Sequence, residues 1–301
     1  MTWFSRLPAQ SRGILYLLVS VTAFTVMDTT AKLLGERVSL PQVLWSRYAG
    51  QLLVLILIFA PRLRPALRTE HPWLQMLRAV MLLGATACFF AALQHLGLAE
   101  VIAIAELSPM LITLGAALFL REQVGLRRGL GVAFGLIGAL IIIRPGSDVF
   151  TTASLLPLAA ASCIATYALV TRHIGLKESP ITALLYSALF CTSVMSVIVP
   201  FHWVRPDALA AGLMLAIGAL GTLAQLTMIR AYSVTEASAI APISHFGLLV
   251  AVALGYAVFG NLPDRWTVLG GLVIVASALY VWHRERKAGT VHTVPEEMGQ
   301  P

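Results

Sequence analysis

The chain has 301 residues, of which 58% are hydrophobic and only 12% are charged, and its formal net charge is +7. A soluble domain needs roughly a quarter of its residues charged to cover its surface, so this composition excludes an ordinary soluble globular protein. Cations that flank apolar segments explain the basic balance, and we therefore expect no nucleic-acid partner.

Ten apolar runs follow one another along the chain, most of them near the ~20 residues that a helix needs to cross a bilayer. Their continuity excludes a β-barrel, whose strands have about ten residues of alternating polarity. The first run continues into polar residues without a small-residue cleavage site, so we interpret it as a retained helix. The runs cover residues 13–33, 41–60, 74–93, 99–120, 129–143, 155–171, 181–199, 208–230, 237–259 and 266–283.

Lysine and arginine are distributed unevenly between the two ends of these runs. With the N-terminus in the cytoplasm, fifteen of them lie at inner ends, Arg78 among them, and five at outer ends, in agreement with the positive-inside rule. The sequence therefore predicts an all-α membrane protein of ten transmembrane helices, with both termini inside, in a bacterial inner membrane. The polar tail, residues 284–301, is predicted to be a disordered cytoplasmic segment.

The two halves of the chain repeat each other at offsets of 136 to 140 residues. We therefore divide it into residues 13–143 and 155–283, each with five spans. An odd number of spans places two tandem copies in opposite orientations, which predicts an inverted repeat. The matches are Lys32, Gly35 and Ser39 with Arg172, Gly175 and Ser179; Glu100, Ala103 and Ser108 with Glu236, Ala239 and Ser244; and Gly131 and Ala139 with Gly270 and Ala278.

The stretches LSPMLITLGAALFLREQVGLRRGLGVAFGLIGALII and APISHFGLLVAVALGYAVFGNLPDRWTVLGGLVIVASALYV resemble a pair of EamA domains of the drug/metabolite transporter superfamily. This resemblance implies that spans 1, 3, 4, 6, 8 and 9 line a central cavity, with spans 5 and 10 at the periphery. Such carriers often have a glutamate after the fourth and ninth spans; Glu122 fits, whereas Asn261 takes the second position. Residues 24–48 further resemble members that take up riboflavin or S-adenosylmethionine.

Ionisable side chains in the middle of a span are costly, so each needs a partner, a water-filled cavity or a proton. Glu106 lies inside the fourth run, close to Pro109, and His245 lies inside the ninth run, close to Pro242. Either side chain is a candidate to bind the solute or to carry a proton, and the alternative is a buried structural hydrogen bond. A central Glu106 favours a solute with a cationic or hydrogen-bond-donating group.

Three further ionisable residues lie in the outer halves of the first two spans. Asp28 and Arg47 neutralise each other if their helices are adjacent, and Lys32 competes for Asp28 from the next helical turn. A static ion pair and a gate that opens during transport both fit this pattern. We also place four polar residues at the substrate site by their helix faces or span ends: Gln225, Tyr232, Thr113 and His95.

The sequence contains no P-loop and no HExxH or GxSxG motif, so we expect neither an enzyme nor a cofactor or bound metal. We predict a permease that moves a small organic metabolite by alternating access. The alternatives are an exporter of amino-acid-like metabolites or drugs, a membrane scaffold or receptor that transports nothing, and intramembrane catalysis. Its expected partners are the solute and the lipid bilayer, and a homodimer stays open.

Overall fold

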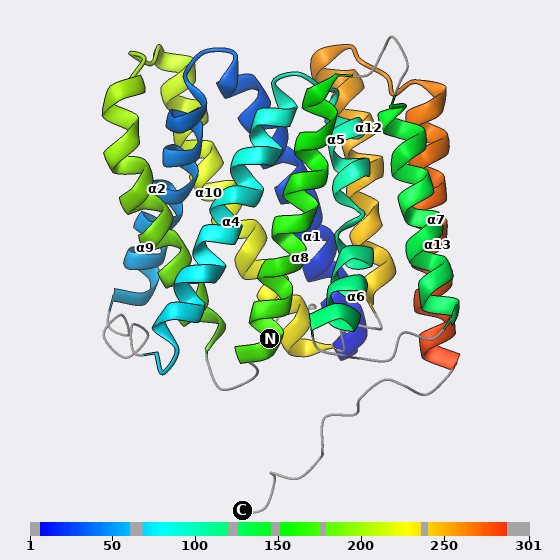
Figure 1. Ribbon diagram of the computed structural model, residues 1–301. Coiled ribbons are helices and arrows are strands. Elements are labelled where there is room, and N and C mark those ends of the chain that lie inside the picture. The colour runs from blue at the N-terminus through cyan, green and yellow to red at the C-terminus, as the bar shows by residue number, and fades with distance from the viewer. Residues whose placement is uncertain are drawn as a thin grey trace, which may run out of the picture.

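The computed structural model describes residues 7–60, 69–119, 126–145, 151–174, 179–235 and 240–287, which form helices and no strands (Figure 1). Within these ranges nine helical segments are long and apolar enough to cross a membrane, and Gly129–Ile143 is a shorter apolar helix. The elements are α1 (Ala9–Gly35), α2 (Leu40–Phe59), α4 (Pro72–Leu93), α5 (Leu98–Ala105), α6 (Ser108–Phe119), α7 (Leu126–Ile143), η3 (Thr152–Ser154), α8 (Leu155–Ile174), α9 (Pro180–Ile198), η5 (Val199–His202), α10 (Ala208–Val234), η6 (Ala241–His245), α12 (Phe246–Phe259) and α13 (Arg265–Lys287).

The ends of these helices have ordinary local causes. α2, α4 and α9 each have a proline in their first two positions, where the missing N–H costs nothing. The Asp207 side chain accepts a hydrogen bond of 2.6 Å from the backbone N–H of Ala210 and so caps α10. Gly260 ends α12 in the left-handed conformation, with φ of 67°, which glycine adopts without steric cost. The predicted runs and the observed helices therefore agree within a few residues at most ends.

The helices pack in a pattern that exchanges corresponding elements of the two halves. α1 lies along α10 while α4 lies along α8, and α7 lies along α13 at one edge of the bundle (Figure 1). The α7–α13 contact is close because a Cβ on Gly270 would lie 2.5 Å from the carbonyl oxygen of Gly138. Gly50 of α2 and Gly218 of α10 meet in the same way. Small residues at helix crossings let backbones approach, as is typical of membrane bundles.

Large apolar side chains lie on the outside of the bundle as well as in its core. Leu57 of α2, Leu215 of α10 and Leu272 of α13 are mostly exposed, whereas the interior holds apolar clusters together with several buried polar side chains. An apolar exterior around a partly polar interior suits lipid better than water. The chain is therefore a multi-pass membrane protein.

Candidate functional site in the polar interior

The fourth and ninth spans are both interrupted where they cross the interior. The run predicted over residues 99–120 forms one apolar span, Leu98–Leu118, but its helix is interrupted, because α5 ends at Ala105 and α6 begins at Ser108. Pro109 has no N–H to donate to the carbonyl of Ala105, so the helical ladder cannot continue there. In the ninth span, the 3₁₀ helix η6 contains Pro242 and joins α12 at His245. Irregular backbone at membrane depth is tolerated only where protein or a cavity surrounds it.

The two interruptions bring Glu106 and His245 together. Glu106 is the C-cap of α5 and His245 is the N-cap of α12, and the Nδ1 atom of His245 lies 2.8 Å from the Oε2 atom of Glu106. The side chain of Glu106 is only 18% exposed and that of His245 only 11%. The short distance lacks hydrogen-bond alignment, since Nδ1 has no hydrogen-bond partner among the described residues. A carboxylate and an imidazole so placed can share a proton or present polar atoms to a solute.

Arg47 lies in the polar interior between α2, α4 and α10 and is only 7% exposed. Its Nη1 atom donates a hydrogen bond of 3.1 Å to the hydroxyl of Thr86. Its guanidinium lies 5.3 Å from the ring centroid of Tyr48 and 5.4 Å from that of Phe90, which stabilises a desolvated cation. Nε is buried and has no hydrogen-bond partner among the residues described. Arg47 therefore retains donor capacity inside the bundle.

The expected cluster of Asp28, Lys32 and Arg47 does not form direct ion pairs. Lys32 turns away and donates hydrogen bonds to the backbone carbonyls of Leu93 and Leu96, the second at 2.6 Å. It thereby satisfies a carbonyl at the C-terminal end of α4, that of Leu93, and one in the turn that follows, that of Leu96. Arg47 acts on the partly buried Asp28 carboxylate through its charge, but no salt bridge of 4.0 Å or less joins them in the described part of the chain. Asp28 thus stays available to other groups.

Gln225 joins the same interior through a side-chain hydrogen bond. Its Oε1 atom accepts from the Nε2 atom of Gln51 at 2.5 Å, which links α10 to α2. One turn away, Gly221 presents its bare backbone to Met27 and Arg47. Gln51, Tyr48 and Thr86 were not among the predicted site residues. Gln51 could have been predicted from the sequence, because it is a polar residue in the middle of an apolar run.

The remaining predicted site residues lie elsewhere. The Thr113 hydroxyl donates to the backbone carbonyl of Pro109 on its own helix, at 3.0 Å. Tyr232 is 45% exposed near the end of α10, and His95 is exposed in the turn between α4 and α5. None of these three contacts the Glu106–His245 pair in the interactions of the described residues. Glu122 lies outside the described residues.

Arg78 is a second buried arginine, although from the sequence it was counted only as a cation at the inner end of the third span. It is 5% exposed and donates hydrogen bonds of 3.3 Å to Gln75 and 3.0 Å to the hydroxyl of Tyr167 on α8. Its guanidinium also lies 4.9 Å from the Tyr167 ring centroid. Counting charges along the sequence could not predict the burial of Arg78, because it does not distinguish a cation two turns inside a helix from one at the end of the helix.

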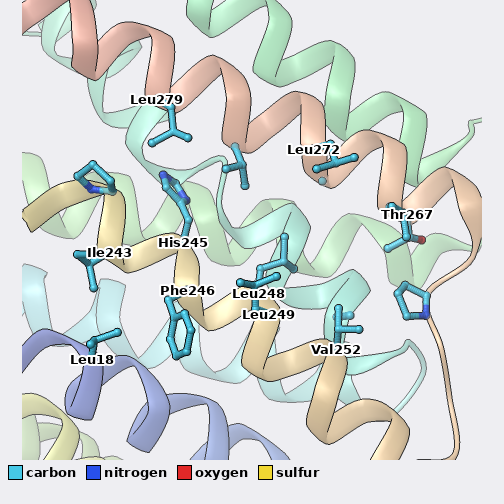
Figure 2. A pocket seen from close by; sticks show the side chains of 16 residues that line it. Leu18, Ile243, His245, Phe246, Leu248, Leu249, Val252, Thr267, Leu272 and Leu279 are labelled. Atoms are coloured by element: carbon cyan, nitrogen blue, oxygen red, sulfur yellow. The ribbon is translucent and has the colours of Figure 1, made fainter. Parts of the chain in front are cut away.

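His245 also faces an apolar groove between α12 and α13. The groove has a volume of about 460 Å³. Figure 2 shows His245 across from Leu279 at one end of it, Leu248 and Val252 further along α12, and Thr267 toward the other end. His245 and Thr267 are the polar side chains among the residues that line it. One face of the Glu106–His245 pair thus borders a lipid-facing groove.

Comparison with known proteins identifies the origin of this architecture. The model of the EamA-like transporter family matches residues 11–144 and again residues 151–282. The chain belongs to the EamA-like transporter family. A solved crystal structure superposes on it with a TM-score of 0.58 at 20% identity, covering 91% of this chain and 98% of the other, which shows a shared fold. This EamA-like transporter is therefore a membrane permease.

Three named relatives align with this EamA-like transporter over almost its whole length. The riboflavin transporter of Vibrio cholerae is 31% identical, with 92% of this chain and 94% of that protein covered. The riboflavin transporter of Brucella anthropi is 29% identical, with 92% and 100% covered. The S-adenosylmethionine uptake transporter of Rickettsia prowazekii is 24% identical, with 92% and 94% covered.

Proposed function

We propose that this permease takes up a neutral, flavin-like vitamin, with riboflavin as the first candidate, across the bacterial inner membrane by alternating access. The balance of charge in the polar interior carries this proposal, together with the names of the two riboflavin-transporting relatives. Arg47, Gln225 and the Glu106–His245 pair offer the donors and acceptors that the polar edge of a flavin ring requires.

The interior charges favour a neutral solute over a cationic one. Among the described residues that are buried or partly buried within the predicted spans, three carboxylates are matched by three cations, so the formal charges cancel when His245 is neutral. The carboxylates are those of Asp28, Glu100 and Glu106, and the cations are Lys32, Arg47 and Arg78. A sulfonium cation such as that of S-adenosylmethionine would need an uncompensated carboxylate at low dielectric. A central Glu106 first suggested a cationic group, but its pairing with His245 weakens that inference.

We further propose ten spans in two inverted repeats with both termini in the cytoplasm. α1 and α13 place residues 9 and 287 on the same side of the bundle (Figure 1), and the exchanged helix pairs fit a pseudo-two-fold axis in the membrane plane. On the opposite side, side chains bridge the halves: Arg37 pairs with Asp207 at 2.7 Å, and Ser39 donates to the carbonyl of His202 at 2.7 Å. These bridges support an outward-closed conformation.

Uptake into proteoliposomes tests the proposal. Purified protein should accumulate labelled riboflavin above protein-free vesicles, and excess unlabelled riboflavin should compete while S-adenosylmethionine should not. Glu106→Gln should lower the initial rate, whereas Glu70→Gln, the same change at an exposed loop position, should not. No riboflavin uptake by folded protein, or competition by S-adenosylmethionine alone, would overturn it. Efflux from loaded vesicles without uptake would indicate an exporter instead.

A further inference from the structure

The apolar groove between α12 and α13 continues into a polar pocket at the end that contains Thr267, which we call its upper end. The pocket has a volume of about 320 Å³ and shares Ala99, Pro263 and Thr267 with the groove. It adds the side chains of Glu100, Arg144 and Asp264, which the groove lacks. The two cavities together have one long apolar part and one short charged part, as an amphipathic ligand requires.

The dimensions of the groove match one leaflet of a bilayer. Thr267 and Leu279 lie at its opposite ends on α13 (Figure 2); twelve residues of helix span about 18 Å. The hydrocarbon of one leaflet is about 15 Å deep, half the ~30 Å core. Trp266, beside the upper end, stacks with Arg265 at 5.5 Å, as expected at a membrane interface. The polar pocket therefore lies at headgroup depth.

The charged side chains in the pocket favour a lipid headgroup that carries both a positive and a negative charge. Arg144 and Asp264 form an ion pair of 2.7 Å, with both side chains partly exposed. Glu100 forms no salt bridge with another described residue, although its carboxylate lies in the fields of the Asp264 carboxylate and of the cations Arg144 and Lys32. One guanidinium beside two carboxylates is suited to a phosphate that carries a primary ammonium.

We propose that this composite cavity binds an aminophospholipid, with its ammonium at Glu100, its phosphate at Arg144 and one acyl chain along α13. Its place in the outer leaflet rests on the orientation proposed above, with both termini in the cytoplasm. This site is separate from the proposed solute path, although His245 borders both. Bound lipid would fill the groove beside the Glu106–His245 pair and exclude water from that side. The inference does not depend on which solute is carried.

Native mass spectrometry of the delipidated protein tests the site. With equimolar phosphatidylethanolamine and phosphatidylglycerol of identical acyl chains, we expect a preference for phosphatidylethanolamine. Glu100→Gln should lower this preference about threefold to tenfold, because it removes one charge-assisted hydrogen bond. Glu36→Gln, at an exposed position near the same end of the bundle, should leave it unchanged.

A matched pair of valines on α13 tests the groove. Val275 lines it, while Val273 faces a different groove, beside α7. Val275→Trp should reduce binding of both lipids at least threefold and Val273→Trp should not; gel filtration establishes that each variant is monodisperse. If Val275→Trp aggregates, Glu100→Gln alone decides. An unchanged lipid ratio in Glu100→Gln, unchanged binding in monodisperse Val275→Trp, or protein dimers that Val275→Trp abolishes would overturn the proposal.

Discussion

The fourth and ninth spans carry the same interruption, with the proline and the ionisable residue in opposite order. At the repeat offset of 136, Glu106 corresponds to Pro242 and Pro109 corresponds to His245, while a serine stands between them in both copies. In each copy the proline lies in the first turn of a new helical segment, where its missing N–H is tolerated. The ionisable residue lies at a helix junction in each copy.

This difference teaches that the duplicated feature is the interruption and not the chemistry. In each copy the break frees the backbone from the helical period at the corresponding position of the repeat. The ionisable side chains at the two breaks meet, since the Nδ1 atom of His245 lies 2.8 Å from the Oε2 atom of Glu106. The repeat thus builds an asymmetric acid–imidazole pair from two symmetric backbones.

The largest expected effect is that of Glu106→Gln. Glutamine keeps the size of the side chain but cannot carry the charge or exchange a proton, so the initial rate of riboflavin uptake should fall at least tenfold. A tenfold change corresponds to about 1.4 kcal/mol, close to the lower end of the range for a hydrogen bond to a charged group. Proteoliposome rates at equal reconstituted protein measure this. A rate within twofold of the unmodified protein would remove Glu106 from the site.

His245→Gln should have a smaller effect, about threefold to fivefold on the same rate, because glutamine retains a donor and an acceptor. The double variant Glu106→Gln/His245→Gln should be no slower than Glu106→Gln alone, since residues in contact couple non-additively. The measurement is a double-mutant cycle on initial rates. Strict additivity would mean that the two residues act independently despite their 2.8 Å separation.

The prolines test the interruptions themselves. Pro109→Ala restores an N–H that can donate to the carbonyl of Ala105, so we expect uptake to fall twofold to threefold while the melting temperature in detergent rises by a few degrees. Pro242→Ala is the matched change in the ninth span. Similar behaviour of the two variants would sharpen the comparison, whereas an unaltered rate in both would show that the breaks are dispensable.

The smallest expected effect concerns the Arg144–Asp264 ion pair. This partly exposed pair serves as a comparison for the buried Glu106–His245 pair. Partial burial raises the pKa of Asp264, but hydrogen bonds from Thr267 and the nearby Arg144 guanidinium outweigh it and hold the pKa below its usual range. A lowered pKa stabilises the fold above the unfolded value of about 3.9, and this contribution disappears as the pH falls through the folded value.

Asp264→Asn should therefore lower the melting temperature by a degree or two at pH 7, and the difference should shrink below about pH 4. Thermal unfolding in detergent at pH 7, 5 and 3.5 measures it. A difference that grows as the pH falls would contradict the sign of the pKa shift.

The sequence by itself determined where the spans lie, where two of them carry prolines, that the halves repeat, and that the chain resembles EamA domains. These features are local, since span length follows from bilayer thickness and a proline disrupts its own helix. Only the tertiary structure decided that Glu106 meets His245, that Lys32 serves the end of α4, and that Arg78 is buried against Tyr167. In a bilayer the lipid-facing and interior surfaces are both apolar, so no hydrophobic periodicity reports how each helix is rotated toward its neighbours.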